Sequence, residues 1–321
     1  MHRVIFNRTR LDLTLEPETP WLVKSGDKGA ALLRPELPDL RFMRTNLGGT
    51  ETVLVPGSSL KGVVRSAAER VLRSVGLPCC DPLDHDGRCQ KEASDKGDAI
   101  ARNSATSRGE AHPMAAVHRM LCLGCRTFGS QAIASRVAFA DALPASDRDR
   151  ERANATEVRS GVSIDRRTGG PAKGRLFESE VVTGGRFAAR IHMHNFELWQ
   201  LALLGIVFQD MNDGFVRIGS AKSRGLGRVR VRWGRLQWEQ VARGDGLEKV
   251  CGVGALDAQV RNAYGLHESR GVTAPKPLRP APLGRALELE GEEIERFLDT
   301  LVDEAWASLV ASASKRGGAV A

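Results

Sequence analysis

The sequence predicts an α+β fold with a ferredoxin-like, RRM-like core, into which a zinc-binding segment and a long β-hairpin are inserted. The order of elements is the first observation behind this prediction. Strand and helix patterns follow one another as strand, helix, strand, hairpin, strand, helix, strand and strand over residues 1–240. The second observation is a polar, cysteine-rich segment that interrupts this order after the first helix. The order is consistent with a β-α-β-β-α-β sheet with insertions.

Size and charge limit the classes of function. The chain has 321 residues, 41% of them hydrophobic, which allows one large domain or two smaller ones with an ample core. Its formal net charge of +8 favours a polyanionic partner. Only 5% of the residues are aromatic, which disfavours the stacking of bases on aromatic side chains. A surface that follows phosphates and shape fits this composition better.

The cellular location follows from what the sequence lacks. No apolar run reaches the roughly 18 residues that a membrane span needs, and the first residues have no secretory signal pattern. We therefore expect a cytoplasmic protein with no membrane partner. The six cysteines are then expected to be metal ligands or free thiols, because disulfides are rare in that compartment.

The first strand is expected over residues 4–15, where leucines alternate with polar residues. The polar loop 24–29 comes soon after it and contains Lys24 and Asp27. Asp27 is either a turn residue that hydrogen-bonds nearby backbone, or a carboxylate beside a bound chain that acts as a base or binds a cation. Residues 32–52 are irregular and predict a hairpin or a mobile loop.

Residues 53–75 predict a short strand, a Pro-Gly turn and a helix whose apolar residues fall on one face. Ser58 or Ser59 can cap this helix. Backbone N–H groups, the two hydroxyls and the ammonium of Lys61 at the helix start would form an anion site. The alternative is a capped core helix that binds nothing. The spacing excludes a polyphosphate P-loop.

Five of the six cysteines lie in residues 76–126, as C-C-x8-C followed by C-x2-C. The segment between them is charged and cannot form a core of its own. A structural zinc ion, held by four thiolates or by three and a histidine, would stabilise it. The preferred ligands are Cys80, Cys89, Cys122 and Cys125, and the possible substitutes are Cys79, His85, His112 and His118. The alternative is a group of unliganded thiols.

The rest of the core predicts strands over residues 135–142, 187–194 and 229–236, a helix over 196–211, and the start of a further strand at 215–218. Residues 144–155 are charged and expected to be exposed. Residues 157–187 predict a hairpin whose tip carries Arg166 and Arg167. The glycine-rich loop 219–228 carries Lys222, Ser223 and Arg224, and its glycines let a backbone approach phosphates closely.

Beyond about residue 240 the signals weaken. Residues 271–282 resemble a linker and residues 283–309 predict an amphipathic helix. We therefore divide the chain into a core over residues 1–240 and a C-terminal extension, linker plus helix, over residues 241–321.

Four motifs carry a resemblance to a known family. Residues 55–62, V-P-G-S-S-L-K-G, together with Arg65, resemble the helix-opening motif of the RAMP superfamily of CRISPR proteins, and residues 219–227, G-S-A-K-S-R-G-L-G, resemble its glycine-rich loop. Residues 122–129 and 161–166 resemble segments of the backbone subunit of type III effector complexes. The resemblance covers residues 4–236.

The resemblance implies a subunit that stacks into a filament along a CRISPR guide RNA, beside other effector subunits, and whose hairpin "thumb" kinks the duplex of guide and complementary target RNA. It implies RNA contacts along the chain at Lys24, Ser58, Ser59, Lys61, Arg65, Arg126, Arg166, Arg167, Lys222, Ser223 and Arg224. Lys61 and Lys222 are expected to converge on one groove.

In relatives of this type, an aspartate in the loop after the first strand cuts the target RNA with a divalent metal ion. Asp27 lies in the matching loop, so the resemblance implies endoribonuclease activity with Mg²⁺ or another divalent cation. The main alternative is a non-catalytic scaffold with cleavage by a separate nuclease. A guide-processing nuclease is disfavoured, because no histidine lies in the glycine-rich loop or next to the first strand. A zinc-stabilised RNA-binding domain unrelated to CRISPR is the last alternative.

Overall fold

The computed structural model describes residues 4–26, 38–81, 84, 89, 113–267 and 270–317. The fold mixes helices with antiparallel sheets, as the sequence predicts. Its centre is a seven-stranded sheet in the order β12-β13-β9-β1-β8-β4, with β5 also paired to β8. The strands are β1 (Asn7–Pro17), β4 (Val137–Phe139), β5 (Leu143–Pro144), β8 (Phe187–His194), β9 (Val229–Gln240), β12 (Arg279–Ala281) and β13 (Gly284–Glu290).

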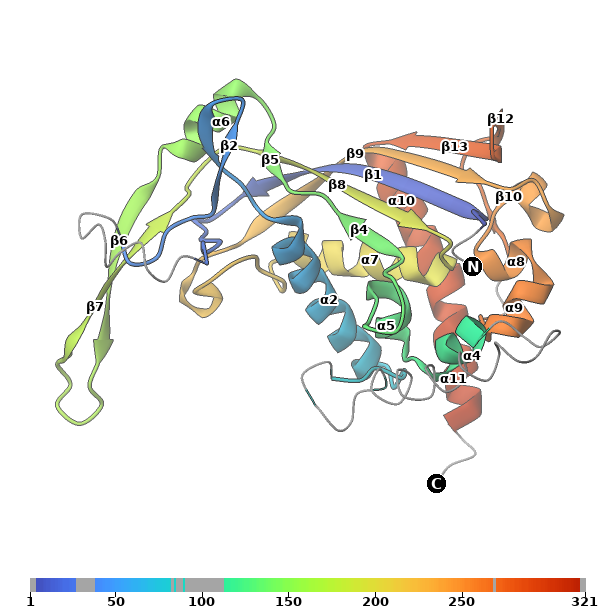
Figure 1. The fold of residues 1–321 in the computed structure, drawn as a ribbon, viewed down its shortest axis with the longest axis horizontal. Coiled ribbons are helices and arrows are strands. Elements are labelled where there is room, and N and C mark those ends of the chain that lie inside the picture. The colour runs from blue at the N-terminus through green and yellow to red at the C-terminus, as the bar shows by residue number, and fades with distance from the viewer. Residues whose placement is uncertain are drawn as a thin grey trace.

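Helices pack on one face of this sheet (Figure 1). Residues of β1 and β8 alternate between buried and more exposed, so Leu11, Leu13 and Ile191 point into the core. The helices on that face are α2 (Gly57–Ser74), α7 (Leu198–Asn212) and α10 (Glu292–Leu301). α7 is the most apolar of these, and ten of its residues are buried. The opposite face of β1, β8 and β9 carries charged side chains.

Two hairpins lie outside the central sheet. The first joins β2 (Arg44–Leu47) to β3 (Thr50–Val53), as expected of residues 32–52. The second joins β6 (Glu157–Ile164) to β7 (Pro171–Val181) and extends away from the rest of the chain (Figure 1). The long hairpin predicted over residues 157–187 is therefore present.

One local prediction is wrong and another is incomplete. Residues 215–218 do not begin a strand, because Val216 and Ile218 bond to Asp210 and Gly227 in a loop, and Phe215 is 77% exposed. Residues 144–155 are mostly exposed, as expected, but two of their side chains, Asp149 and Ala153, are buried. The segment forms helix α6 (Asp147–Asn154), capped by Ser146, and its Asp149 side chain is buried against Arg186.

The chain after residue 240 also differs from the expected linker and helix. The proline-rich segment forms β12, and residues predicted to start a helix form β13, which pairs with β9 across six residue pairs. The helix begins only at α10 and continues through a π-helical turn (Val302–Trp306) into α11 (Ala307–Gly317). The C-terminal residues thus extend the central sheet, while the domain division at residue 240 stays an interpretation of the sequence.

Short elements complete the fold. They are α4 (Pro113–Met120), α5 (Leu123–Phe128), α8 (Val253–Leu256), α9 (Ala258–Tyr264), the two-stranded pair β10 (Lys249–Val250) and β11 (Val272–Thr273), and the 3₁₀ turns at Lys222–Arg224 and Gly244–Leu247. None of the helices in the described ranges is both long and apolar enough to cross a membrane.

Candidate nucleic-acid interface and metal site

The glycine-rich loop, residues 219–227, is hydrogen-bonded to the segment that follows β1. The Ser220 N–H donates to the Leu22 carbonyl at 2.8 Å, and the Gly227 N–H donates to the Pro20 carbonyl at 2.9 Å. Gly219 has a φ of +89°, and a Cβ there would lie 2.3 Å from the Leu22 oxygen. Only glycine satisfies both constraints. The loop cations are therefore held beside the segment that carries Lys24.

The same segment leads through further backbone hydrogen bonds toward the start of α2. The Met43 N–H donates to the Val23 carbonyl at 2.8 Å, and the Leu54 N–H donates to the Met43 carbonyl at 3.0 Å. The glycine-rich loop and Leu54 are thus three hydrogen-bonded steps apart, with two backbone segments between them. At about 4.8 Å for each step, the separation is about 14 Å. The two RAMP-like motifs therefore lie near each other in the fold.

The start of α2 packs directly against β4. A Cβ on Gly57 would lie 2.2 Å from the Phe139 carbonyl oxygen, so this glycine permits the contact. The prediction that Ser58 or Ser59 caps the helix is wrong. The N-cap residue is Pro56, which makes no side-chain cap, and the Gly57 N–H donates to the Asp141 carboxylate at 2.7 Å. The hydroxyls of Ser58 and Ser59 therefore do not cap this helix.

Gly62 lies on the exposed face of α2 between Ser58 and Ser66. Nothing lies within 4 Å of the position that its Cβ would take. A glycine inside a helix costs about 1 kcal/mol relative to alanine. Packing within the described residues gives no reason for it, so Gly62 leaves room for a molecule that approaches the helix backbone closely.

The two motif lysines lie near different flanks of α2. Burial and the charge of nearby Arg70 lower the pKa of Lys222 from its ordinary value. Burial and the charge of Arg65 lower the pKa of Lys61. Because Lys61 and Arg70 are nine positions apart, they point in roughly opposite directions from the helix axis. A chain that contacts both lysines would therefore cross the exposed face of α2 that contains Gly62.

Cations without an ion-pair partner gather around the glycine-rich loop and the start of α2. In the described part of the chain, no ion pair involves Lys24, Lys61, Lys222 or Arg224, although carboxylates are common elsewhere. The Arg224 guanidinium instead lies 5.5 Å from the centre of the Phe177 ring in β7. Cations without a carboxylate partner suit phosphate groups.

The open face of the sheet is different, because its arginines are paired across strands. These pairs are Arg8–Glu239, Arg190–Asp12, Arg230–Glu18, Arg232–Glu16 and Arg235–Glu288. Each pair offsets the charge that would attract a phosphate. The open face of the sheet is therefore a poorer polyanion site than the region around the glycine-rich loop and the start of α2.

The long hairpin is anchored by a buried carboxylate. Glu180, at the base of β7, accepts hydrogen bonds from Arg44, from the Phe42 N–H and from Thr156. Burial opposes ionisation of Glu180, but these donors outweigh it and lower the pKa of Glu180. The hairpin tip is exposed at Arg166 and Arg167, where no ion pair forms among the described residues.

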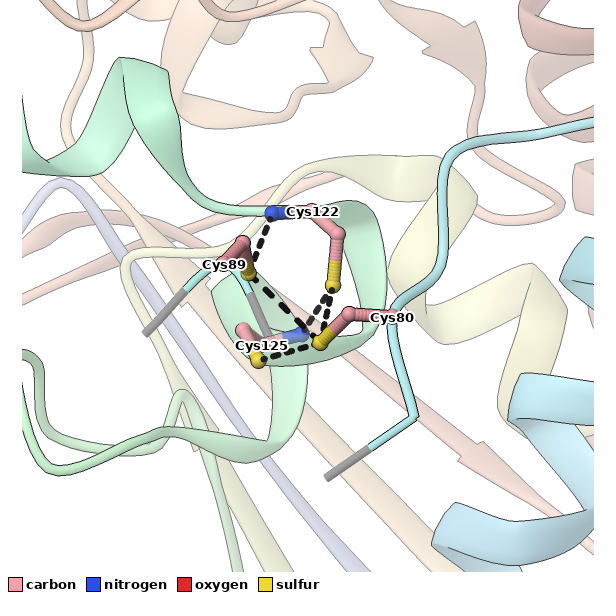
Figure 2. Close-up of side chains that lie close together, drawn as sticks. All are labelled: Cys80, Cys89, Cys122 and Cys125. Carbon is pink, nitrogen blue, oxygen red and sulfur yellow. Dashed lines mark hydrogen bonds between the residues drawn. The ribbon is translucent and has the colours of Figure 1, made fainter. Parts of the chain in front are cut away.

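The four preferred cysteines lie together (Figure 2). Their ligand atoms are all within 4.8 Å of one another. The Cys80 sulfur lies 3.7 Å from Cys125, 3.6 Å from Cys89 and 3.5 Å from Cys122. A tetrahedral ion with metal–sulfur distances of about 2.3 Å needs sulfurs about 3.8 Å apart. The cluster can therefore hold a metal ion after small adjustments.

The ionisation of this cluster also suits a cation. The neighbouring thiols of Cys125, Cys79 and Cys89 lower the pKa of the Cys122 thiol. In return, the closeness of Cys122 raises the pKa of Cys125, and raises that of Cys89 to about 12. One thiolate is thus stabilised by neighbouring thiols. Four thiolates would need a bound cation to offset their repulsion.

The structure does not bring all predicted site residues together. Arg126 bonds to the carbonyls of His118, Arg119 and Gly265, and Arg65 bonds within the protein near the cysteines. Their RNA contacts stay predictions. His118 is bonded to the Tyr264 carbonyl and is not in the cysteine cluster. His85, His112 and Asp27 lie outside the described residues.

Sequence reasoning missed Asp141 and Glu180. Asp141 is 84 residues from the helix start that it bonds, and Glu180 is 136 residues from Arg44. No local signal marks such distant partners.

The fold and the unpaired cations define a mixed α and β protein with a surface suited to a polyanion. The family model of the RAMP superfamily matches residues 14–230, which is more than half of the chain. The chain therefore belongs to the RAMP superfamily, as its motifs predicted. This membership indicates a CRISPR-associated, RNA-binding subunit. A search of curated proteins found no match.

Proposed function

We propose that this chain is the filament-forming backbone subunit of a type III-like CRISPR effector complex. In this role it binds the guide RNA, stacks with other copies along it, and contacts both the target RNA and other effector subunits. We also interpret the core as ferredoxin-like. Its elements β1, α2, β4, β8, α7 and β9 follow a β-α-β-β-α-β order, with the strands ordered β9-β1-β8-β4.

The observation that carries this proposal is the group of unpaired cations where the two family motifs meet. Lys24, Lys222 and Arg224 lie on hydrogen-bonded neighbouring segments, and Lys61 lies across the exposed face of α2. We infer that the guide backbone runs from the glycine-rich loop over Gly62 to the start of α2. Ser58, Ser59 and Ser223 are positioned in the sequence to donate hydroxyl hydrogen bonds along this path.

The hairpin β6–β7 supports the proposed thumb. Exposed apolar side chains, Val158, Val162 and Leu176, share one face, because Val162 pairs with Leu176. A two-stranded ribbon is only marginally stable alone in water, so we expect a partner to cover this face. Arg166 and Arg167 at the tip would contact nucleic acid. A neighbouring copy in the filament and the guide–target duplex are the partners that the proposal assigns to the ribbon.

We propose that Asp27 cleaves the target RNA with Mg²⁺ or another divalent cation. A kink in the duplex would present a ribose 2′-OH in line with the adjacent phosphorus, and a nearby carboxylate would accept its proton or bind the metal. Lys24, three residues before Asp27, is exposed and could offset the developing negative charge.

We propose zinc as the ion for the cysteine cluster, because four thiolates with near-tetrahedral spacing are typical of structural zinc sites. Cys80, Cys89, Cys122 and Cys125 would fill its coordination, which leaves no open position for catalysis. The ion would join the segment after α2 to α5 and so stabilise the insertion.

A binding experiment tests the proposed RNA surface. The purified chain is titrated into labelled single-stranded RNA at several salt concentrations. Lys222→Ala should weaken binding and reduce the slope of log affinity against log salt by about 0.7, the value for one phosphate contact on a single strand. Lys276→Ala is the matched control, because this lysine pairs with Glu293 in the C-terminal region. Equal effects of the two substitutions would contradict the proposal.

A further inference from the structure

The side chain of Arg65 joins helix α2 to the cysteine cluster. Its Nε donates to the Glu69 carboxylate at 2.7 Å, and one terminal nitrogen donates to the Gly129 carbonyl at 3.1 Å. The other terminal nitrogen lies 3.9 Å from the Cys125 sulfur, within range of a long hydrogen bond. The planar guanidinium thus uses all three nitrogens inside the protein.

Glu69 holds this arrangement in place. Its side chain is only 7% exposed, and it also lies 3.7 Å from a guanidinium nitrogen of Arg73. Arg73 in turn donates to the Cys80 carbonyl at 3.3 Å. A Cβ on Gly124 would lie 3.5 Å from the Glu69 side chain, so the cysteine turn packs directly on this carboxylate. One buried carboxylate therefore positions two arginines toward two of the cysteines.

The charge of the site explains why a carboxylate can be buried there. A Zn²⁺ ion with four thiolates carries two net negative charges, and Glu69 adds a third. Arg65, Arg73 and Arg126 supply three positive charges, and Arg126 interacts electrostatically with Cys122 and Cys89. With the ion bound and all four thiols ionised, the cluster, Glu69 and these three arginines have no net charge together. Outer groups that bond to metal ligands commonly change metal affinity 10- to 100-fold.

We propose that Arg65 is a positioning residue of the metal site, which donates to the Cys125 thiolate and ties metal retention to helix α2. Its guanidinium is therefore not a free phosphate contact, although the motif that contains it resembles an RNA-binding one. The role of Arg65 at the metal site does not depend on RNA binding. Only its consequence rests on the proposed RNA surface, which includes Ser58 and Lys61 in the first turns of α2. An RNA surface on α2 would lose its fixed position when the ion is removed.

The test measures zinc without RNA, so its outcome does not depend on the proposed RNA binding. Zinc-loaded protein is mixed with a chromophoric chelator, and the rate and extent of zinc release are recorded. Arg65→Met should release zinc at least about tenfold more readily than the natural chain. Arg70→Met, on the same helix and without a contact to the cysteines, should behave as the natural chain does. Equal retention by Arg65→Met and the natural chain would overturn the proposal.

A second measurement covers the case in which Arg65→Met does not fold. Arg65→Lys keeps the charge, but one ammonium cannot reach Glu69, Gly129 and Cys125 together. In the cobalt-substituted protein, loss of the donor to sulfur should move the sulfur-to-metal charge-transfer band to longer wavelength. A purely structural role of Arg65 would leave this band unchanged, and an unchanged band in folded Arg65→Lys contradicts the inference.

Discussion

The substitution Gly62→Ala should have opposite effects on stability and on RNA binding. Gly62 lies in the interior of α2, on its exposed face, and nothing lies within 4 Å of where its Cβ would be. The added methyl group therefore meets no steric obstacle in the free protein. An RNA backbone that crosses this face would meet the methyl group directly.

The structure sets the size of both effects. An exposed glycine in a helix is about 0.5–1 kcal/mol less stable than alanine. Because the methyl group meets no clash, the free energy of unfolding of the alanine variant should rise by most of that amount. For a chain of this size, this corresponds to a rise in Tm of about 2 °C. Loss of a close backbone contact in the complex should weaken RNA binding by about 1 kcal/mol, or about fivefold.

Thermal unfolding and RNA titration of the same preparation measure the two effects. Ser66→Ala is a matched control, because it changes an exposed residue one turn further along α2. A variant that is more stable and binds RNA as well as the natural chain would refute the path over Gly62. A variant that loses stability would refute the structural description of α2.

Three further predictions concern other parts of the chain. Asp27→Ala should abolish metal-dependent cleavage of a complementary RNA and leave guide binding unchanged, and unaltered cleavage would remove the proposed role. Gly219→Ala should lower the free energy of unfolding by about 1–3 kcal/mol, because its φ of +89° and the nearby Leu22 oxygen exclude a side chain, and an unchanged urea midpoint would contradict this. Glu180→Gln should be less stable at neutral pH, because Arg44 loses its buried charged partner and keeps only the exposed Glu51. Since the folded-state pKa of Glu180 is lowered, its contribution exists above the ordinary value of 4.5 and disappears as the pH falls through the folded-state pKa. The two proteins should therefore converge in stability in acid, and a constant difference across pH would contradict the assignment.

Local patterns in the sequence were enough for the core elements. The alternation in β1 and β8 has a clear period of two, and α7 is marked by a long apolar run. The four cysteines were also predictable, because their spacing is typical of metal ligands. The strand and helix signals depend on residues that lie close together in the chain, and each of the two cysteine pairs is itself a local motif.

The errors occurred where distant residues decide the structure. The start of α2 resembles a serine-capped helix, but packing on β4 puts Asp141 at the Gly57 N–H instead. Residues 284–290 alternate in the way of a strand, yet their pairing partner β9 lies far earlier in the chain. Arg65 matches an RNA-binding motif, and only its fixed position beside Glu69 and Cys125 reveals another role. Tertiary contacts of this kind leave little trace in a single sequence.

We expect the RNA to lie along the unpaired cations around the glycine-rich loop and the start of α2, and not on the open face of the sheet. Cross-linking of the bound guide RNA, followed by mass spectrometry, tests this most directly. The account predicts cross-linked peptides from residues 58–62 and 219–227. Cross-links concentrated on the paired arginines of β1, β8 and β9 would contradict it.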